Sequence, residues 1–196
     1  MNKTILITGA TSGIGLACAR KFAANGDRLI LTGRNERRLN DISKELKAQG
    51  TEVLTLCFDV RDRDKAKEAV AALPSEWQTI VVLVNNAGLA LGLEPEYEGC
   101  FDDWETMIDT NIKGLLTMTR LIVPGMVERN SGHIINIDFV VVVVDYNILE
   151  IYYFDHIVEE EIVVDYMDYY IDLVDYIYLE EVVDYIEVVD IEEDIY

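Results

Sequence analysis

The sequence has no Lys, Arg, Gly or Pro after residue 132. The last basic residue is Arg129 and the last glycine is Gly132, although the 196 residues include 16 Lys and Arg, 12 Gly and 3 Pro. Residues 138–196 are almost entirely Val, Ile, Tyr, Asp and Glu. No turn residue divides this acidic low-complexity segment into elements, so helix, strand and disorder all stay open for it. We therefore predict a boundary between a domain of residues 1–137 and the segment 138–196.

Cysteine and long apolar runs are also scarce. The three cysteines, Cys18, Cys57 and Cys100, are scattered, which excludes a disulfide framework and a zinc site with paired ligand spacing. We expect reduced thiols, no bound metal and a cytoplasmic location. The first apolar run is too short for a signal peptide, and no stretch approaches the ~18 uncharged apolar residues of a transmembrane helix.

Positive charge is missing from one end of the chain only. The formal net charge is -21, yet all 16 Lys and Arg residues lie before residue 130, so the first part is nearly neutral. The acidic segment repels phosphate backbones and anionic lipids. We expect neither nucleic-acid nor membrane partners, and no feature of the sequence supports the open option of a homo-oligomer.

Short β-branched runs alternate with longer helical patterns in the first part. Strands are predicted at residues 3–8, 28–32, 53–58, 79–84 and 133–137. Helices are predicted at residues 13–25, 35–49, 62–73 and 101–129, the last kinked or broken where Pro124 removes a backbone donor. This order predicts an α/β fold: a Rossmann-like, doubly wound parallel sheet, incomplete on its C-terminal side.

A glycine-rich turn stands between the first predicted strand and helix. Glycines at such a turn let the backbone approach a diphosphate, and the helix N-terminus presents free amides to it. The predicted cofactor-binding residues of the turn are Gly9, Thr11, Ser12, Gly13, Ile14 and Gly15. This domain is therefore predicted to bind a dinucleotide.

The end of the second predicted strand indicates which dinucleotide is bound. Sites specific for NAD place a carboxylate here, which accepts from the ribose 2′-hydroxyl. This chain has Arg34 followed by Asn35. Because a guanidinium pairs well with a 2′-phosphate, we predict NADP(H) as the cofactor and both residues as part of its site.

The motif T-G-x-x-x-G-x-G at residues 8–15 resembles that of the short-chain dehydrogenase/reductase family. Three further segments resemble other motifs of this family and follow in the same order. They are Asp59-Val60 after the third strand, the NNAG segment at residues 85–88, and Asn111 in TNIKG. The resemblance covers about residues 3–137. It implies that Asp59, Val60, Asn86, Ala87 and Gly88 bind the cofactor and that Asn111 is a catalytic residue.

The resemblance also indicates a reaction. The segments NNAGLALG and DWETMIDTN are similar to those of bacterial NADP-dependent 3-hydroxy acid (serine/allo-threonine) dehydrogenases. It therefore implies an oxidoreductase that transfers hydride between NADP and a small 3-hydroxy acid or hydroxy amino acid.

The rest of the family's catalytic set is Ser, Tyr and Lys, and this chain departs from it. Asp138 and Phe139 stand where the family has Gly and Ser, and Tyr152 falls where the catalytic Tyr is expected. His156 replaces the Lys that lowers the pKa of this Tyr. We therefore predict Tyr152 as the remaining acid/base candidate in an inactive chain. The alternatives are a non-catalytic NADP(H)-binding module, or a non-native chain without activity.

Overall fold

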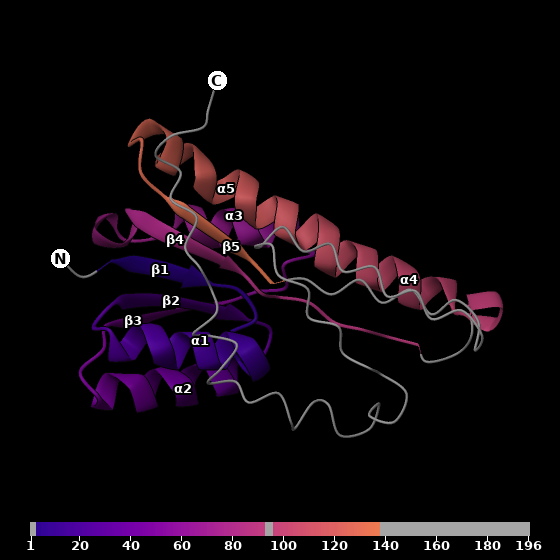
Figure 1. The fold of residues 1–196 in the computed structure, drawn as a ribbon, viewed down its shortest axis with the longest axis horizontal. Coiled ribbons are helices and arrows are strands. Elements are labelled where there is room, and N and C mark those ends of the chain that lie inside the picture. The colour runs from indigo at the N-terminus through magenta and orange to yellow at the C-terminus, as the bar shows by residue number, and fades with distance from the viewer. Residues whose placement is uncertain (1–2, 93–95, 138–196) are drawn as a thin grey trace, which may run out of the picture.

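A computed structural model describes residues 3–92 and 96–137 of the chain. They form one five-stranded sheet in the order β3-β2-β1-β4-β5, in which every neighbouring pair is parallel (Figure 1). The strands are β1 Thr4–Ile7, β2 Arg28–Gly33, β3 Val53–Cys57, β4 Ile80–Asn85 and β5 His133–Asn136. The predicted Rossmann-like α/β class is confirmed, and each predicted strand exists with its ends within one residue.

Helices cover both faces of the sheet. The helices α1 Gly13–Ala24 and α2 Glu36–Ala48 lie on one face, and α3 Arg63–Ala71 and α5 Leu115–Glu128 lie on the other (Figure 1). Short 3₁₀ turns at Ser75–Trp77 and Glu96–Glu98 complete the connections. Side chains of a strand alternate between two faces, so Ile5 and Ile7 of β1 join one core while Leu6 joins the other.

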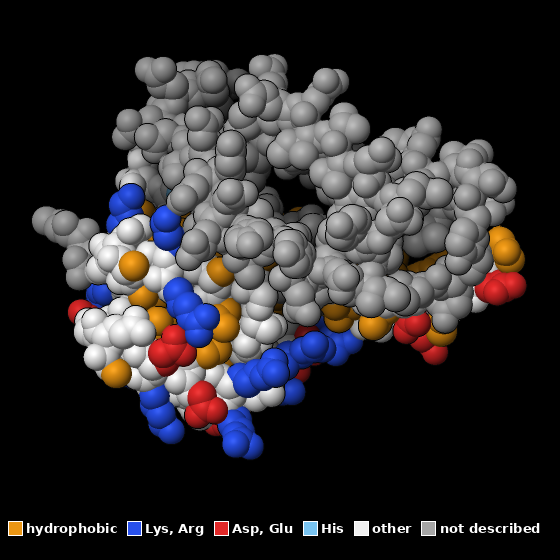
Figure 2. Space-filling model, turned by 60° about the horizontal axis from the view of Figure 1, so that its bottom comes forward, with side chains coloured by type: hydrophobic (Ala, Val, Ile, Leu, Met, Phe, Trp, Pro, Cys, Tyr) orange, Lys and Arg blue, Asp and Glu red, His pale blue; other side chains and the backbone are white. Residues whose placement is uncertain are grey.

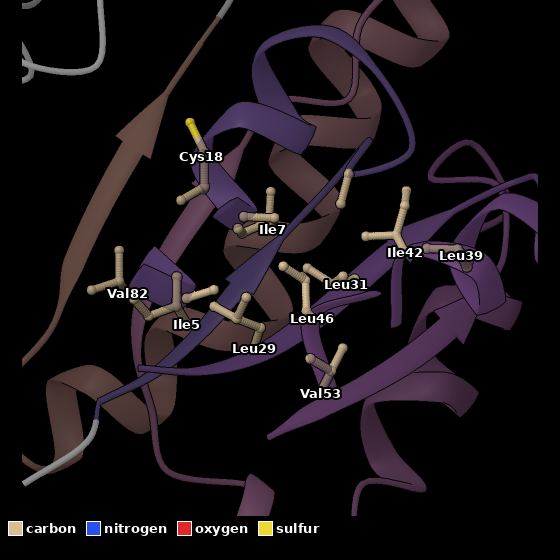
Figure 3. Packing of buried hydrophobic residues seen from close by; sticks show 14 of the residues in the cluster. Ile5, Ile7, Cys18, Leu29, Leu31, Leu39, Ile42, Leu46, Val53 and Val82 are labelled. Carbon is tan, nitrogen blue, oxygen red and sulfur yellow. The ribbon is translucent and has the colours of Figure 1, made fainter. Parts of the chain in front are cut away.

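The core beneath α1 and α2 is made mainly of aliphatic side chains, which come from these two helices and from all five strands. Figure 3 shows side chains of β1 and β2 meeting those of α2, with Cys18 of α1 beside them. The members Ile5, Leu29 and Leu46 are fully buried. A central strand covered on both faces is apolar throughout, which explains the uninterrupted runs in β1 and β4.

The predicted long helix differs from expectation at two points. It runs as α4 Phe101–Met107, a π-helical segment Ile108–Gly114 and α5, and it continues through Pro124. The helix does not break at Pro124, so that alternative was wrong, and the kink stays a prediction. Both Pro124 and Arg120, whose carbonyl loses its helical donor, are exposed, so water can reach this side of the helix.

The described surface carries charges of both signs. On the face drawn in Figure 2, Lys and Arg side chains are interspersed with Asp and Glu. Such interspersion produces no large field of one sign over the part of this face that belongs to the described residues. Within residues 3–92 and 96–137, no helix is long and apolar enough to cross a bilayer.

Candidate functional site

The predicted cofactor residues converge at one edge of the sheet. The glycine-rich turn follows β1, Arg34 follows β2, Asp59 follows β3 and Asn86 follows β4. These are the carboxyl ends of parallel strands, where open α/β sheets bind ligands. The strand order reverses beside β1, since β2 lies on one side of it and β4 on the other. The edge thus has the arrangement of a dinucleotide crevice.

The turn between β1 and α1 suits an anion. Gly9 and Gly13 have φ angles of 65° and 53°, a region that non-glycine residues rarely adopt. Ser12 precedes the first turn of α1 and makes no side-chain capping bond. A Cβ at Gly13 would meet no atom within 4 Å, so the space over the turn is open. The backbone amides at the start of α1 can therefore donate hydrogen bonds to a diphosphate oxygen.

Two glycines permit close packing beneath this turn. A Cβ on Gly15 would lie 2.6 Å from the Gly9 carbonyl oxygen and would also collide with the Asn86 amide. A Cβ on Gly33 would lie 2.8 Å from the Thr11 methyl group. Gly33 holds the turn close to β2, a role that sequence reasoning did not assign.

A hydrogen-bond network from Thr8 and Asn86 holds the turn against β4. The Thr8 hydroxyl donates to the Val84 carbonyl at 3.3 Å and accepts from the backbone amides of Asn86 and Ala87, both at 2.9 Å. The Asn86 side chain donates to the Thr8 and Gly9 carbonyls, at 2.9 and 3.2 Å. Its side-chain amide thus braces the turn. The role of Thr8 was missed, because its partners lie far away in sequence.

Replacing Thr8 by Val tests this network. The change keeps the side-chain shape but leaves two partly buried amides without an acceptor. We expect the free energy of unfolding to fall by about 1–3 kcal/mol. Thr117→Val is the matched control, because its hydroxyl donates only to the Lys113 carbonyl one turn earlier; we expect a change within about 0.5 kcal/mol. Equal effects in urea unfolding would contradict the bracing role.

Asp59 lies between two arginines. Arg61 Nη2 donates to Asp59 Oδ2 at 2.7 Å, and Arg34 Nη1 lies 3.9 Å from the same oxygen. The side-chain hydrogen bond from Arg61 lowers the pKa of Asp59, its backbone amide and the charges of both arginines add to this, and partial burial opposes it. The same bond raises the pKa of Arg61. Asp59 is therefore a fixed carboxylate at the end of β3.

The lowered pKa gives stability that depends on pH. The unfolded chain takes up the proton of Asp59 at a higher pH than the folded chain does. The stabilisation from this carboxylate is thus complete above its ordinary pKa of 3.8 and is lost as the pH falls through the folded-state value. The unfolding free energies of the wild type and Asp59→Asn should differ by a constant amount above about pH 5 and converge below it. Divergence on acidification would contradict the ion pair.

Two predicted residues have structural tasks at this edge. The Asn35 side chain caps α2 by accepting from the Arg38 amide at 3.0 Å. Val60 is buried, and a Cβ on Gly114 would lie 2.7 Å from its Cγ2 atom. Any contact of Val60 with a cofactor would therefore use its backbone.

Asn111 lies in the π-helical segment and is buried. Its side chain accepts from the Leu89 amide at 3.0 Å and donates to the Leu89 carbonyl at 2.9 Å. A π-helical turn within an α-helix often marks a functional site. These contacts show that Asn111 positions the segment after β4, and its catalytic role stays a prediction.

A second asparagine network lies between β4, β5 and α5. The Asn85 side-chain amide donates to Thr119 Oγ1 at 3.0 Å and to Asn136 Oδ1 at 2.9 Å. Its own Oδ1 atom is buried and has no partner. The sequence patterns assigned no role to Asn136. The two neighbouring strand ends are joined through side chains here.

The remaining catalytic candidate, Tyr152, lies outside the described residues. So do Asp138, Phe139 and His156, which stand where the family has Gly, Ser and Lys, and the predicted domain boundary after residue 137 borders the same region. Among residues 3–92 and 96–137, no group of three His, Cys, Asp or Glu side chains could hold a metal ion.

A family model described as short chain dehydrogenase matches residues 3–153. The chain belongs to the short chain dehydrogenase family. The match confirms the resemblance stated from the motifs and runs past residue 137, so that it includes Tyr152. The carboxyl edge of the sheet is therefore part of a dehydrogenase fold.

Known members of the family resemble the first part of the chain. NADP-dependent 3-hydroxy acid dehydrogenase YdfG of Salmonella typhi is 57% identical over 133 residues, and that of Escherichia coli K12 is 53% identical. These matches cover 68% of this chain and 52% of each relative, so the chain spans about half the length of the curated relatives it matches.

Solved structures of serine dehydrogenase are similar as well. The enzyme from Escherichia coli is 51% identical with a TM-score of 0.63, and the match covers 68% of this chain and 60% of that one. A closed form of serine dehydrogenase complexed with NADP+ is 52% identical, also with a TM-score of 0.63, over 68% and 52% of the two chains.

Proposed function

We propose that this chain binds NADP(H) at the carboxyl edge of its sheet. The observation that carries the proposal is the open turn at residues 9–15, with two glycines at positive φ and an uncapped helix start. The amides at the start of α1 bind the diphosphate. Arg34 pairs with the 2′-phosphate, and Asp59 accepts from the adenine amine.

The relatives support the choice of cofactor and a substrate class. They are named as NADP-dependent 3-hydroxy acid dehydrogenases, and one neighbour was solved with NADP+. The nicotinamide of NADP supplies a hydride acceptor, and NADPH supplies the donor. A small 3-hydroxy acid or hydroxy amino acid is the substrate class we propose, with Tyr152 exchanging the hydroxyl proton.

Turnover by this chain is a separate matter from binding. A Ser that orients the substrate oxygen and a Lys that assists the Tyr are replaced by Phe139 and His156. An unassisted phenol with a pKa of about 10 is ionised in roughly one molecule per thousand at neutral pH. We therefore propose that the chain holds NADP(H) and turns over hydroxy acids far more slowly than its relatives.

A fluorescence titration tests the binding proposal. The full chain is titrated with NADPH, and NADH serves as the control because it lacks only the 2′-phosphate. We expect saturable enhancement of NADPH fluorescence and a Kd for NADH that is roughly tenfold higher or more. Indistinguishable weak responses to both would overturn the proposal.

Steady-state NADPH formation with L-serine or 3-hydroxybutyrate tests the expected lack of turnover. We expect no measurable rate from the wild type. The triple change Asp138→Gly, Phe139→Ser and His156→Lys should raise it if these residues reach the nicotinamide. A substantial wild-type rate that Tyr152→Phe abolishes would show that the chain is an active dehydrogenase.

A further inference from the structure

Two arginines face one carboxylate at the ends of β2 and β3. Asp59 Oδ2 lies 2.7 Å from Arg61 Nη2 and 3.9 Å from Arg34 Nη1. The Nε atom and the backbone amide of Arg61 also donate to this carboxylate, at distances of 3.0 to 3.1 Å. The Asp59 carboxylate is therefore hydrogen-bonded to Arg61, whereas its contact with Arg34 is the longer one.

We propose that Arg61 is a positioning residue that sets the preference of this site for NADP(H) over NAD(H), by holding Asp59 away from Arg34. The inference rests on the proposed function, in which Arg34 pairs with the 2′-phosphate. It adds a residue that touches neither coenzyme and acts through the carboxylate alone.

Charge balance gives the physical reason. Arg34, Asp59 and Arg61 together leave one positive charge at this corner. Without Arg61, Asp59 and Arg34 balance each other, and the freed carboxylate can close the 3.9 Å gap to form a tight pair with Arg34. Such a pair competes directly with a 2′-phosphate for the guanidinium.

Exposure of the three side chains favours this competition. The Arg34 side chain is 62% exposed, while those of Asp59 and Arg61 are 27% and 35% exposed. Arg34 thus has room to turn toward either a phosphate or a carboxylate. Arg61 and Asp59 form the more enclosed pair, which holds the carboxylate in place.

The competition for Arg34 changes the affinity only for a ligand that has a 2′-phosphate. Asp59 also contacts the adenine in the proposed function, and any loss of that contact weakens the binding of both coenzymes equally. The ratio of two affinities cancels that shared part. Adenosine 2′,5′-bisphosphate and AMP are suitable probes, because they differ only in the 2′-phosphate and both omit the nicotinamide half of the cofactor.

Calorimetric titration of the full chain with both probes is the test. For Arg61→Ala we expect the Kd of adenosine 2′,5′-bisphosphate to rise roughly fivefold to twentyfold relative to that of AMP. Arg63→Ala, which removes the same charge two residues further on, should leave the ratio within roughly twofold. Adding Asp59→Asn to Arg61→Ala should restore the ratio, because no carboxylate remains to trap Arg34.

The outcomes separate this inference from the proposed function. If Arg61→Ala keeps the wild-type ratio while Arg34→Ala loses it, the inference is overturned and the binding proposal stands. A double variant that does not recover the ratio also overturns the inference. A wild type that binds both probes equally overturns both proposals. Should Arg61→Ala not fold, as checked by circular dichroism, Arg61→Gln removes the charge while keeping the packed stem, and the same ratio decides.

Discussion

Replacing Gly15 by Ala is expected to abolish tight NADP+ binding and to lower the free energy of unfolding by about 2 kcal/mol. The added methyl group would lie 2.6 Å from the Gly9 carbonyl oxygen and would strike the Asn86 side chain. Neither atom can retreat easily, since Asn86 braces the turn through bonds to Thr8 and Gly9. Helix propensity alone favours Ala over Gly by about 1 kcal/mol, so destabilisation would identify the contact as the cause.

The measurements for Gly15→Ala are urea unfolding and NADPH titration. Gly50→Ala is the matched control: Gly50 has a φ of 92°, and a Cβ there would meet no atom within 4 Å. Its replacement strains the backbone, which replacement of the helical Gly15 does not, but it causes no collision, and Gly50 lies away from the site. It therefore shows whether a loss of stability alone changes the Kd. We expect reduced stability with an unchanged Kd. Wild-type affinity in Gly15→Ala would show that the turn does not hold the diphosphate.

Replacing Arg34 by Ala is expected to raise the Kd for NADP+ by roughly tenfold to a hundredfold and to leave the Kd for NAD+ within roughly twofold. The reason is that a charge-assisted hydrogen bond to the 2′-phosphate is lost, whereas NAD+ has no group at that position. Because the Arg34 side chain is 62% exposed, its removal costs little packing. Calorimetric titration with both coenzymes measures the two constants.

The control for Arg34→Ala is Lys44→Ala, which removes one positive charge from an exposed position further along α2. Its effect on either Kd should be small at physiological ionic strength, because screening weakens interactions between distant surface charges. An equal loss of affinity for NADP+ and NAD+ in Arg34→Ala would mean that Arg34 supports the fold at the end of β2 and does not bind the 2′-phosphate.

The sequence predicted the parts of the site that depend on local geometry. The alternation of β-branched runs and helical patterns predicted five parallel strands, and the glycine spacing at residues 9–15 predicted the turn between β1 and α1. Gly13 shows why this worked: a positive φ is a local requirement that glycine meets at low cost. The placement of candidate residues at the strand ends followed from the same order of elements.

Local sequence patterns did not predict which side chains are hydrogen-bonded to one another. Asn86 was predicted as a cofactor residue, yet its amide bonds the Thr8 and Gly9 carbonyls. The bidentate hold of Arg61 on Asp59 also went unseen, although only two positions separate the residues. Sequence spacing says which residues can be near, while the direction of each side chain depends on the packing around it.

By itself, the sequence determined the fold class, the family and the position of the phosphate-binding turn, because periodicity and glycine spacing act over a few residues. Only the tertiary structure decided that Thr8 and Asn86 brace the turn, that Asn111 holds the segment after β4, and that the helix continues through Pro124. Each of these depends on atoms brought together from distant positions in the chain, or on which side of a helix faces water.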